Sequence, residues 1–142
     1  MVDYALPSRI PGRGALLVRY GDGADSLTLA IAHLSLSPKA RSAQLAFLGE
    51  LLSGPGHKVL MGDFNCESDS CEMDALYRST PLQPPEQRIL SFPSWQPSRA
   101  IDHILVSSGV NVERRWTLPD LSSDHLAVAA QIAFRDSLGK SR

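Results

Sequence analysis

Residues 58–65 read KVLMGDFN, a short apolar run that ends abruptly in polar side chains. The run from Val59 to Met61 predicts a short buried strand, and Asp63 and Asn65 follow where that strand leaves the core. Binding and catalytic sites of layered α/β proteins form at strand ends. Because Asp63 and Asn65 are two positions apart in an extended segment, both side chains can project to the same side. The segment therefore predicts a central strand with a site at its end.

Two apolar runs before this segment predict a β-hairpin. Residues 15–20 (ALLVRY) end at the turn residues 21–23 (GDG), and residues 27–33 (LTLAIAH) alternate after it. Apolar runs joined by a short glycine-containing turn are typical of antiparallel strands. The second run places His33 at a strand end.

Two helices are predicted from capping residues and spacing. Ser37 and Pro38 fit an N-cap and a first helical position, and apolar residues then recur at helical spacing until the GPG sequence at residues 54–56. This segment predicts an amphipathic helix of about four turns. A shorter helix is predicted over residues 71–77, with Ser70 as its cap.

The rest of the chain predicts an extended loop and three further strands. Prolines mark the loop around residues 81–85. The strands are predicted over residues 101–106, 112–117 and 126–133. Strands whose connections supply the helices indicate an α/β or α+β layered fold. We expect the domain to span residues 15–134, with residues 1–14 as an N-terminal extension and residues 135–142 as a polar tail that frays.

Length and charge limit the classes of protein to consider. With 142 residues, of which 43% are hydrophobic, the chain can bury one modest core and is one domain or part of one. Its formal net charge of -1 excludes the broad basic surface of non-specific duplex binders. The scattered arginines, among them Arg9, Arg13 and Arg41, are interpreted as solvated surface.

Cysteine use and hydropathy bear on the cellular compartment. Cys66 and Cys71 are five positions apart, which fits neither a CxxC redox pair nor a zinc site, so both are interpreted as reduced thiols. The amino terminus lacks a signal-peptide pattern, and no stretch reaches the roughly 20 apolar residues of a membrane span. We expect a soluble, cytoplasmic protein.

Polar side chains lie at the ends of predicted strands: His33, Asp63 with Asn65, Asp102 with His103, and Asp124 with His125. Each has an ordinary structural explanation, as a boundary histidine, a turn residue or a carboxylate that stabilises a loop. Together they supply what hydrolysis of a phosphate ester needs: carboxylate oxygens for a hard divalent cation, a base for water and donors for the phosphate. If the strands are neighbours, these side chains converge in one cleft.

Asp102 and His103 are adjacent in a strand, so their side chains point to opposite faces and only one can belong to this cleft. We predict Asp102, because a carboxylate held against a histidine fixes the tautomer and raises the basicity of that histidine. His125 is then expected to bond to Asp102, with His103 pointing elsewhere.

Four short motifs occur in order: HLSL at 33–36, GDFN at 62–65, IDHI at 101–104 and SDHLAV at 123–128. In this order they resemble the motifs of the endonuclease/exonuclease/phosphatase superfamily, and FPSW at 92–95 resembles the family segment before the Asp-His strand. The resemblance runs from about Arg13 to Ile132. It implies part of a four-layer α/β/β/α sandwich with mixed β-sheets. It also implies hydrolysis of a phosphate ester in nucleic acid, inositol phosphate or a phospholipid headgroup, with Mg²⁺ or Mn²⁺ as cofactor.

The resemblance also implies roles for the residues near the carboxyl end. Asp124 resembles the metal-side aspartate of the family. His125 resembles the histidine that contacts phosphate or helps to activate water, and Asp102 resembles the carboxylate that orients it.

Three residues of the earlier motifs resemble the phosphate side of the family site. Asp63 and Asn65 resemble the pair that positions the attacking water and the phosphate. His33 resembles a second histidine, which binds phosphate or acts as an acid. Ile31 and Ala32 precede it where many members have Asn-Thr, which weakens the phosphate side slightly.

The chain departs from the family pattern at its start. Members begin with an asparagine-bearing strand and a strand ending in a Gln-Glu pair, whose glutamate is the principal metal ligand, and no such segment precedes Ala15. We expect a carboxyl-terminal portion whose first half is absent by truncation, by a missed gene start or as a separate chain. Of the glutamates considered as replacements, which are Glu50, Glu67 and Glu72, none has a spacing that favours this role. Glu67 is the first to test if magnesium binds tightly.

Such a portion is expected to be poorly stable or to self-associate. Two alternatives to an enzyme stay open. One is a catalytically silent family remnant that acts as a binding module. The other is an unrelated α/β binding domain with coincidental motifs.

Overall fold

The computed structural model describes residues 1–134, and the predicted fraying of residues 135–142 lies outside this part. In chain order the elements are β1 (Val2–Ala5), β2 (Gly14–Tyr20), the 3-10 helix η1 (Gly23–Asp25), β3 (Leu27–His33), α1 (Pro38–Leu52), β4 (His57–Asp63), α2 (Met73–Ser79), β5 (Asp102–Val106), β6 (Val110–Leu118) and β7 (Ala127–Phe134). None of these helices is long and apolar enough to cross a membrane.

Five strands form the larger sheet, in the order β1-β2-β3-β4-β5. β3 and β4 run parallel and the other neighbours run antiparallel, so the sheet is mixed. A parallel pair needs a long crossover connection, which α1 and its flanking loops provide. β6 and β7 form a separate antiparallel pair, with an irregularity between Val112 and Arg114.

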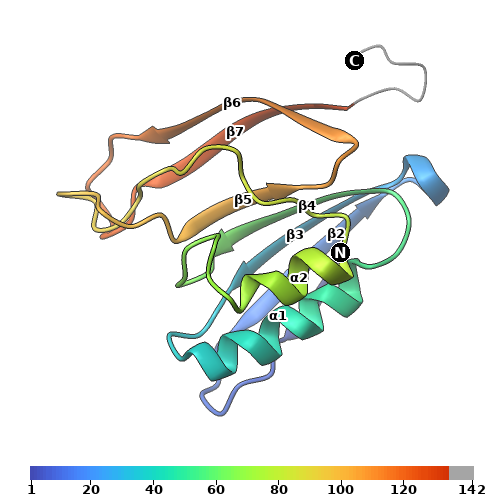
Figure 1. Ribbon diagram of the computed structural model, residues 1–142, viewed down its shortest axis with the longest axis horizontal. Helices are drawn as coiled ribbons and strands as arrows, with labels where there is room; N and C mark the ends of the chain where they lie inside the picture. The colour runs from blue at the N-terminus through green and yellow to red at the C-terminus, as the bar shows by residue number, and fades with distance from the viewer. Residues whose placement is uncertain (135–142) are drawn as a thin grey trace.

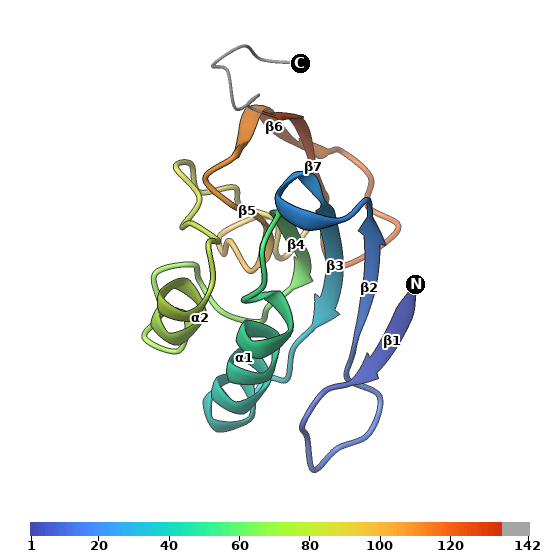
Figure 2. The ribbon, with the colours of Figure 1, turned by 90° about the vertical axis from the view of Figure 1, so that its right-hand side faces the viewer.

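The elements are arranged in layers. Both helices cover one face of the larger sheet, and the β6–β7 pair lies over its other face (Figure 1). Figure 2 shows β1 at the far edge of the larger sheet, beside β2. The predicted α+β fold with a mixed sheet is therefore confirmed. The order of helices, larger sheet and smaller sheet corresponds to part of an α/β/β/α sandwich.

The core lies between the helices and the larger sheet. In β3, Ala30 faces the helices and is buried, whereas Ile31 on the other face is 50% exposed. On α1, Leu45, Leu48 and Leu52 are fully buried, because a spacing of three and four residues places them on one face of the helix. Alternation along the strand and the three-and-four spacing along the helix thus decide which face of the sheet packs against which face of α1.

The other face of the larger sheet is apolar across four strands. Leu16, Ile31, Met61 and Ile104 are paired in one row from β2 to β5. The β6–β7 pair contacts this sheet mainly through β5. As a result, the part of the row nearest β2 and β3 keeps apolar surface in contact with solvent.

The structure adds one strand that the sequence did not predict. Within residues 1–14, β1 pairs antiparallel with β2, in a register that joins Val2 to Leu17 and Ala5 to Gly14. Most of its side chains are exposed, so its four residues carry no apolar pattern. Its stability comes from backbone pairing with β2, which local sequence does not reveal.

The predicted helix caps differ from the observed ones. Ser37 precedes Pro38 at the start of α1, as predicted, but its side chain makes no capping hydrogen bond. The shorter helix begins at Met73, two residues later than predicted. The hydroxyl of Ser70 donates instead to the carbonyl of Glu67, at 2.8 Å, so Ser70 stabilises the turn before the helix.

A buried ion pair joins the two helical segments to the loop after β3. Arg41 donates from Nε and Nη2 to Oε1 of Glu72, at 2.8 and 2.5 Å. Its Nη1 donates to the carbonyls of Ser35 and Leu36. The two charged side chains are only 9% and 8% exposed. Arg41, interpreted from sequence as solvated surface, is therefore a structural residue.

The Arg41–Glu72 pair should make stability depend on pH. Burial raises the pKa of Glu72, but the hydrogen bonds and charge of Arg41 outweigh this, so the pKa lies below its ordinary value of 4.5. A lowered folded-state pKa means that the pair stabilises the fold above that ordinary value, and that this contribution is lost as pH falls through the lowered value. Glu72→Gln should cost about 3 kcal/mol at neutral pH.

The test is urea unfolding of wild type and Glu72→Gln across the acid range. Wild type should lose more stability than the variant between about pH 5 and pH 3. Glu50→Gln, at an exposed position of α1, is the matched control and should keep the wild-type slope. If the free energies of unfolding of wild type and Glu72→Gln decreased equally with pH over this range, the pair would not have this role.

Candidate active site

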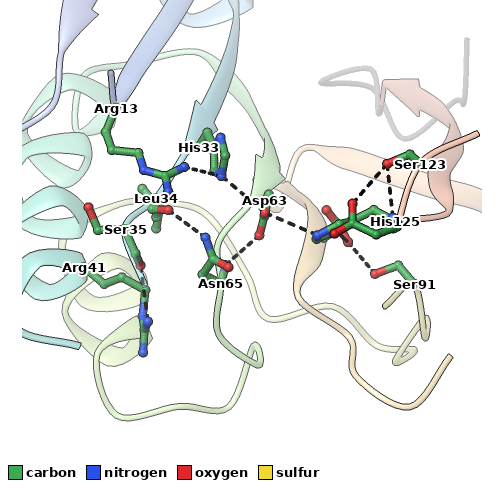
Figure 3. A network of polar contacts seen from close by, with 12 residues as sticks. Arg13, His33, Leu34, Ser35, Arg41, Asp63, Asn65, Ser91, Ser123 and His125 are labelled. Carbon is green, nitrogen blue, oxygen red and sulfur yellow. Dashed lines mark hydrogen bonds and ion pairs between the residues drawn. The ribbon is translucent and has the colours of Figure 1, made fainter. Parts of the chain in front are cut away.

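Strand register brings the predicted site residues together. His33 ends β3 and is paired with Asp63 at the end of β4, because these two strands run parallel. Asp63 is in turn paired with Asp102, the first residue of the antiparallel β5. Paired residues project to the same face of a sheet. The three side chains therefore lie in a row on the face towards β6 and β7, and His125 reaches them from the segment before β7 (Figure 3).

A chain of short polar contacts links these residues. His125 Nδ1 lies 2.8 Å from Oδ2 of Asp102, and His125 Nε2 lies 3.8 Å from Oδ2 of Asp63. The same Asp63 oxygen lies 3.4 Å from Nε2 of His33. The structure thus brings His33, Asp63, Asp102 and His125 together, and His125 contacts Asp102 as predicted. A cleft of about 380 Å³ borders Asp63, Asp102 and His125 between the sheets.

His103 points away from this cleft, as expected from its position next to Asp102. Its side chain is buried, with Nε2 2.8 Å from the carbonyl of Cys66. Its ring packs edge-on against Phe64, with 5.2 Å between ring centres. Burial lowers the pKa of His103, against the opposing effects of Cys66 and Asp102. His103 is therefore a neutral residue of the interior.

Asn65 stabilises the turn that follows β4. It adopts a left-handed backbone conformation with φ of 53°, which asparagine tolerates better than most residues. Its backbone N–H donates to Oδ1 of Asp63 at 2.8 Å, and its side-chain Nδ2 donates to the carbonyl of Leu34 at 2.8 Å. These bonds leave the amide oxygen of Asn65 as the group that can face a ligand.

Two residues for which the sequence predicted no role hold the His125–Asp102 pair. Ser91 is fully buried, and its hydroxyl donates to Oδ2 of Asp102 at 2.5 Å. The carbonyl of Ser91 accepts the N–H of Leu126 at 2.8 Å. The ring of Phe92 packs on that of His125, with 4.8 Å between ring centres. Both residues lie in a loop without a periodic pattern. Phe92 begins the FPSW segment that resembles the family, and Ser91 directly precedes it, so this segment was the one signal in the sequence.

The sequence of this chain matches a known protein family. The model of the endonuclease/exonuclease/phosphatase family matches residues 5–125, which is most of the chain. The chain belongs to this family. No protein among the curated ones matches the chain.

Several solved structures share the family fold. A functionally unknown conserved protein from Enterococcus faecalis is 23% identical, with a TM-score of 0.74, and the match covers 94% of this chain and 65% of that one. A mannosyl-6-phosphatase from Bacteroides thetaiotaomicron is 20% identical, with a TM-score of 0.77 and the same coverage. The human Nocturnin catalytic domain, solved with sulfate, is 20% identical, with a TM-score of 0.68, and is covered over 58% of its length. The chain thus spans less than two thirds of these structures.

Charge at the site favours a protonated His125. Burial lowers its pKa, but the hydrogen bond and charge of Asp102, together with the charges of Asp63 and Asp124, outweigh this and raise the pKa above its ordinary value. A histidine with a raised pKa keeps its proton more readily near neutral pH. In this family site, the imidazole can therefore donate towards an anion as well as accept from water.

The cluster contains groups that could hold a metal ion. One ligand atom from each of Asp63, Asp102 and His125 lies within 4.8 Å of the others. Oδ2 of Asp102 accepts from both His125 and Ser91, and Oδ1 of Asp63 accepts the N–H of Asn65, so Oδ1 of Asp102 and Oδ2 of Asp63 are the less engaged oxygens within residues 1–134. Carboxylate oxygens suit a hard divalent cation better than an imidazole does. The cluster fits such an ion through its oxygens.

Asp124, the predicted metal ligand, lies outside that group of three. Its side chain is exposed, and Oδ1 lies 3.4 Å from the hydroxyl of Ser123. The glutamates considered as replacements are engaged elsewhere: Glu67 pairs with Arg88 at 2.7 Å, and Glu72 pairs with Arg41. Glu67 also accepts the N–H of Ala100. Neither glutamate belongs to the cluster.

Proposed function

We propose that this chain is a metal-dependent phosphoesterase that hydrolyses a phosphate ester bond by attack of water assisted by a metal, a histidine and aspartates. The observation that carries the proposal is the contact of His125 with Asp102 on one side and Asp63 on the other, inside the cleft between the sheets. Membership of the family gives the reaction class.

The proposed reaction assigns a role to each side chain. Water attacks phosphorus and gives up a proton, which Nε2 of His125 accepts. The bond from phosphorus to the ester oxygen breaks, and the departing oxygen takes up a proton. Asp102 holds the Nδ1 proton of His125, so that Nε2 faces Asp63 and the cleft. Asp63 and Asn65 position the attacking water and the phosphate. His33 binds phosphate or supplies the proton.

We infer Mg²⁺ or Mn²⁺ as the cofactor, held by Asp124 beside the cluster. When bound, the ion supplies positive charge to the phosphate oxygens. Within residues 1–134, the hydroxyl of Ser123 is the one hydrogen-bond partner of the Asp124 carboxylate, which leaves this carboxylate able to accept a cation. Asp124 directly precedes His125 in the chain, and its negative charge helps to raise the pKa of His125.

Magnesium should bind weakly to this chain. Magnesium keeps several waters and is usually held by more than one carboxylate, so Asp124 alone should give a dissociation constant on the order of millimolar. Calorimetry should show this weak binding, and Asp124→Asn should abolish it. Asp120→Asn, an exposed aspartate of the same loop, should bind like wild type. Tight, stoichiometric binding that survives Asp124→Asn would mean that other residues hold the ion.

Labelled water tests the proposed reaction directly. In water enriched in ¹⁸O, hydrolysis of a phosphodiester should place one labelled oxygen in the phosphate product and none in the alcohol, because the bond that breaks is the one to phosphorus. A chelator should stop the reaction, and Mg²⁺ or Mn²⁺ should restore it. Label in the alcohol, or activity that a chelator leaves unchanged, would rule out this mechanism.

One observation favours the alternative of a silent binding module. The chain spans 65% of the Enterococcus and Bacteroides structures, and Glu67 and Glu72 are engaged in ion pairs away from the cluster. Such a module would bind a phosphate ester in the same cleft without releasing product. Equilibrium binding of a phosphodiester with no turnover, in the presence of Mg²⁺, would identify it.

The apolar face of the larger sheet supports self-association. Ile31 is 50% exposed in a row with Leu16 and Met61, and a second copy could bury the same row on both partners. Gel filtration should give a peak larger than the monomer, and Ile31→Lys should shift it towards the monomer. Ile10→Lys, at an exposed loop position, is the control. A sharp monomer peak with a cooperative, high-temperature unfolding transition would contradict this expectation.

A further inference from the structure

Arg13 reaches the candidate active site from the segment between β1 and β2. It directly precedes β2, which is paired with β3 so that Ala15 lies opposite Ala32, next to His33. Its Nη1 contacts Nε2 of His33. Figure 3 shows Arg13, His33, Asp63 and His125 in one row, with Arg13 at the end opposite His125. The guanidinium therefore belongs to the surroundings of the site, although the sequence suggested solvated surface.

Arg13 differs from the other arginines near the site in what its guanidinium binds. A guanidinium has five N–H donors. Arg41 uses its donors on Glu72 and on two backbone carbonyls, and Arg88 uses two on Glu67. Within residues 1–134, the one side-chain partner of Arg13 is His33, and no carboxylate pairs with it. Its charge and most of its donors are available to a ligand.

The contact with Arg13 also determines what His33 can do. Because a guanidinium only donates, Nε2 of His33 must accept, and its ring proton then sits on Nδ1. The same Nε2 lies 3.4 Å from Oδ2 of Asp63, but it cannot donate to that carboxylate while it accepts from Arg13. An anion that binds the guanidinium of Arg13 in place of His33 frees Nε2 of His33 from this contact. A ligand of Arg13 thus changes the hydrogen bonding of the row.

We propose that Arg13 binds the phosphate of the substrate and shifts the preference of the site towards a terminal, doubly charged phosphate and away from a singly charged diester. This inference rests on the proposed function. The carboxylates of Asp63 and Asp102 repel an incoming anion, and the always-charged Arg13 opposes that repulsion. Its attraction to a charge of two is twice its attraction to a charge of one. A terminal phosphate also presents more free oxygens to the planar guanidinium fork.

The test compares two anions on matched variants. Inorganic phosphate at a pH of about 8, where it is doubly charged, and dimethyl phosphate, which is singly charged, are titrated into labelled protein and followed by NMR. The proteins are wild type, Arg13→Gln, Arg13→Lys and Arg9→Gln. Arg9 is an exposed arginine on the same segment, and no hydrogen bond of its side chain is seen in residues 1–134. Titrations are run in a chelator and again with excess Mg²⁺.

Arg13→Gln should weaken the binding of inorganic phosphate on the order of tenfold and the binding of dimethyl phosphate by about threefold. Arg13→Lys should recover part of the loss, because it keeps the charge without the fork. Arg9→Gln should bind both anions like wild type. Equal losses for the two anions, no difference between Arg13→Gln and Arg9→Gln, or no binding to wild type in either condition would each overturn the proposal.

Hydrolysis measured on the same proteins separates this inference from the proposed function. If no protein hydrolyses a phosphate ester but phosphate binding depends on Arg13, the anion site stands and the proposed enzyme fails. If wild type hydrolyses monoesters and diesters and Arg13→Gln keeps both KM values, the enzyme stands and the role of Arg13 fails. Thermal unfolding of Arg13→Gln should match wild type, since the Arg13 side chain is partly exposed and His33 is its one side-chain hydrogen-bond partner within residues 1–134.

Discussion

Asp102→Asn should lower phosphate-ester hydrolysis by about three orders of magnitude while leaving the fold intact. Oδ2 of Asp102 accepts the Nδ1 proton of His125 at 2.8 Å and a second bond from Ser91 at 2.5 Å. An asparagine has the same shape but can present an N–H where the carboxylate accepts. The ring of His125 would then lose the fixed proton on Nδ1, and Nε2 would no longer be held ready towards Asp63.

Steady-state kinetics and thermal unfolding check this expectation together. The loss should appear in kcat rather than in KM, because Asp102 acts on the histidine and not on the bound phosphate. Asp22→Asn, an exposed aspartate in the turn before η1, is the control and should keep wild-type activity. A kcat within a few-fold of wild type for Asp102→Asn would remove His125 and Asp102 from the mechanism.

Gly62→Ala should destabilise the protein by about 3 kcal/mol and also disturb the site. Gly62 has a φ of 139°, which residues with side chains rarely adopt, and an added Cβ would lie 1.9 Å from the carbonyl oxygen of Ala32. β3 and β4 would have to separate there. Asp63 is the next residue, so its contact with His33 would change and activity should fall with stability.

Urea unfolding and the hydrolysis rate measure the two effects of Gly62→Ala. The matched control is Gly54→Ala, in the connection after α1, where an added Cβ would meet nothing within 4 Å. That variant should keep both wild-type stability and wild-type activity. If Gly62→Ala behaved like Gly54→Ala, the close approach of β4 to β3 would not be needed to position Asp63.

Local patterns predicted the elements that carry most of the site. Apolar runs bounded by polar residues located β3, β4 and β5. Alternation along the strand allowed only one of Asp102 and His103 in the cleft, and the chemistry of a carboxylate held against a histidine favoured Asp102. The sequence pattern could not say whether these strands are neighbours. In the structure β3, β4 and β5 are adjacent, and their register pairs His33 with Asp63 and Asp63 with Asp102. Convergence of the site therefore follows from pairing between strands distant in sequence.

Residues that act through long-range contacts were not predicted. Ser91 and Arg13 lie in irregular segments. Ser91 contacts Asp102, eleven positions away in the sequence, and Arg13 contacts His33, twenty positions away. β1 has no apolar pattern of its own and depends on β2 for its hydrogen bonds. Arg41 is one of many arginines by sequence, and only the burial of Glu72 against it shows its structural role.

The magnesium-dependent rate of phosphodiester hydrolysis by the purified chain, measured beside His125→Ala, tests the central claim most directly. His125 connects Asp102 to Asp63 in the cleft, and its removal leaves both carboxylates without the group between them. Wild type should hydrolyse the diester faster than buffer with magnesium, and His125→Ala should fall to the rate of buffer. Equal rates for wild type and His125→Ala would contradict the assignment of this cleft as a phosphoesterase site.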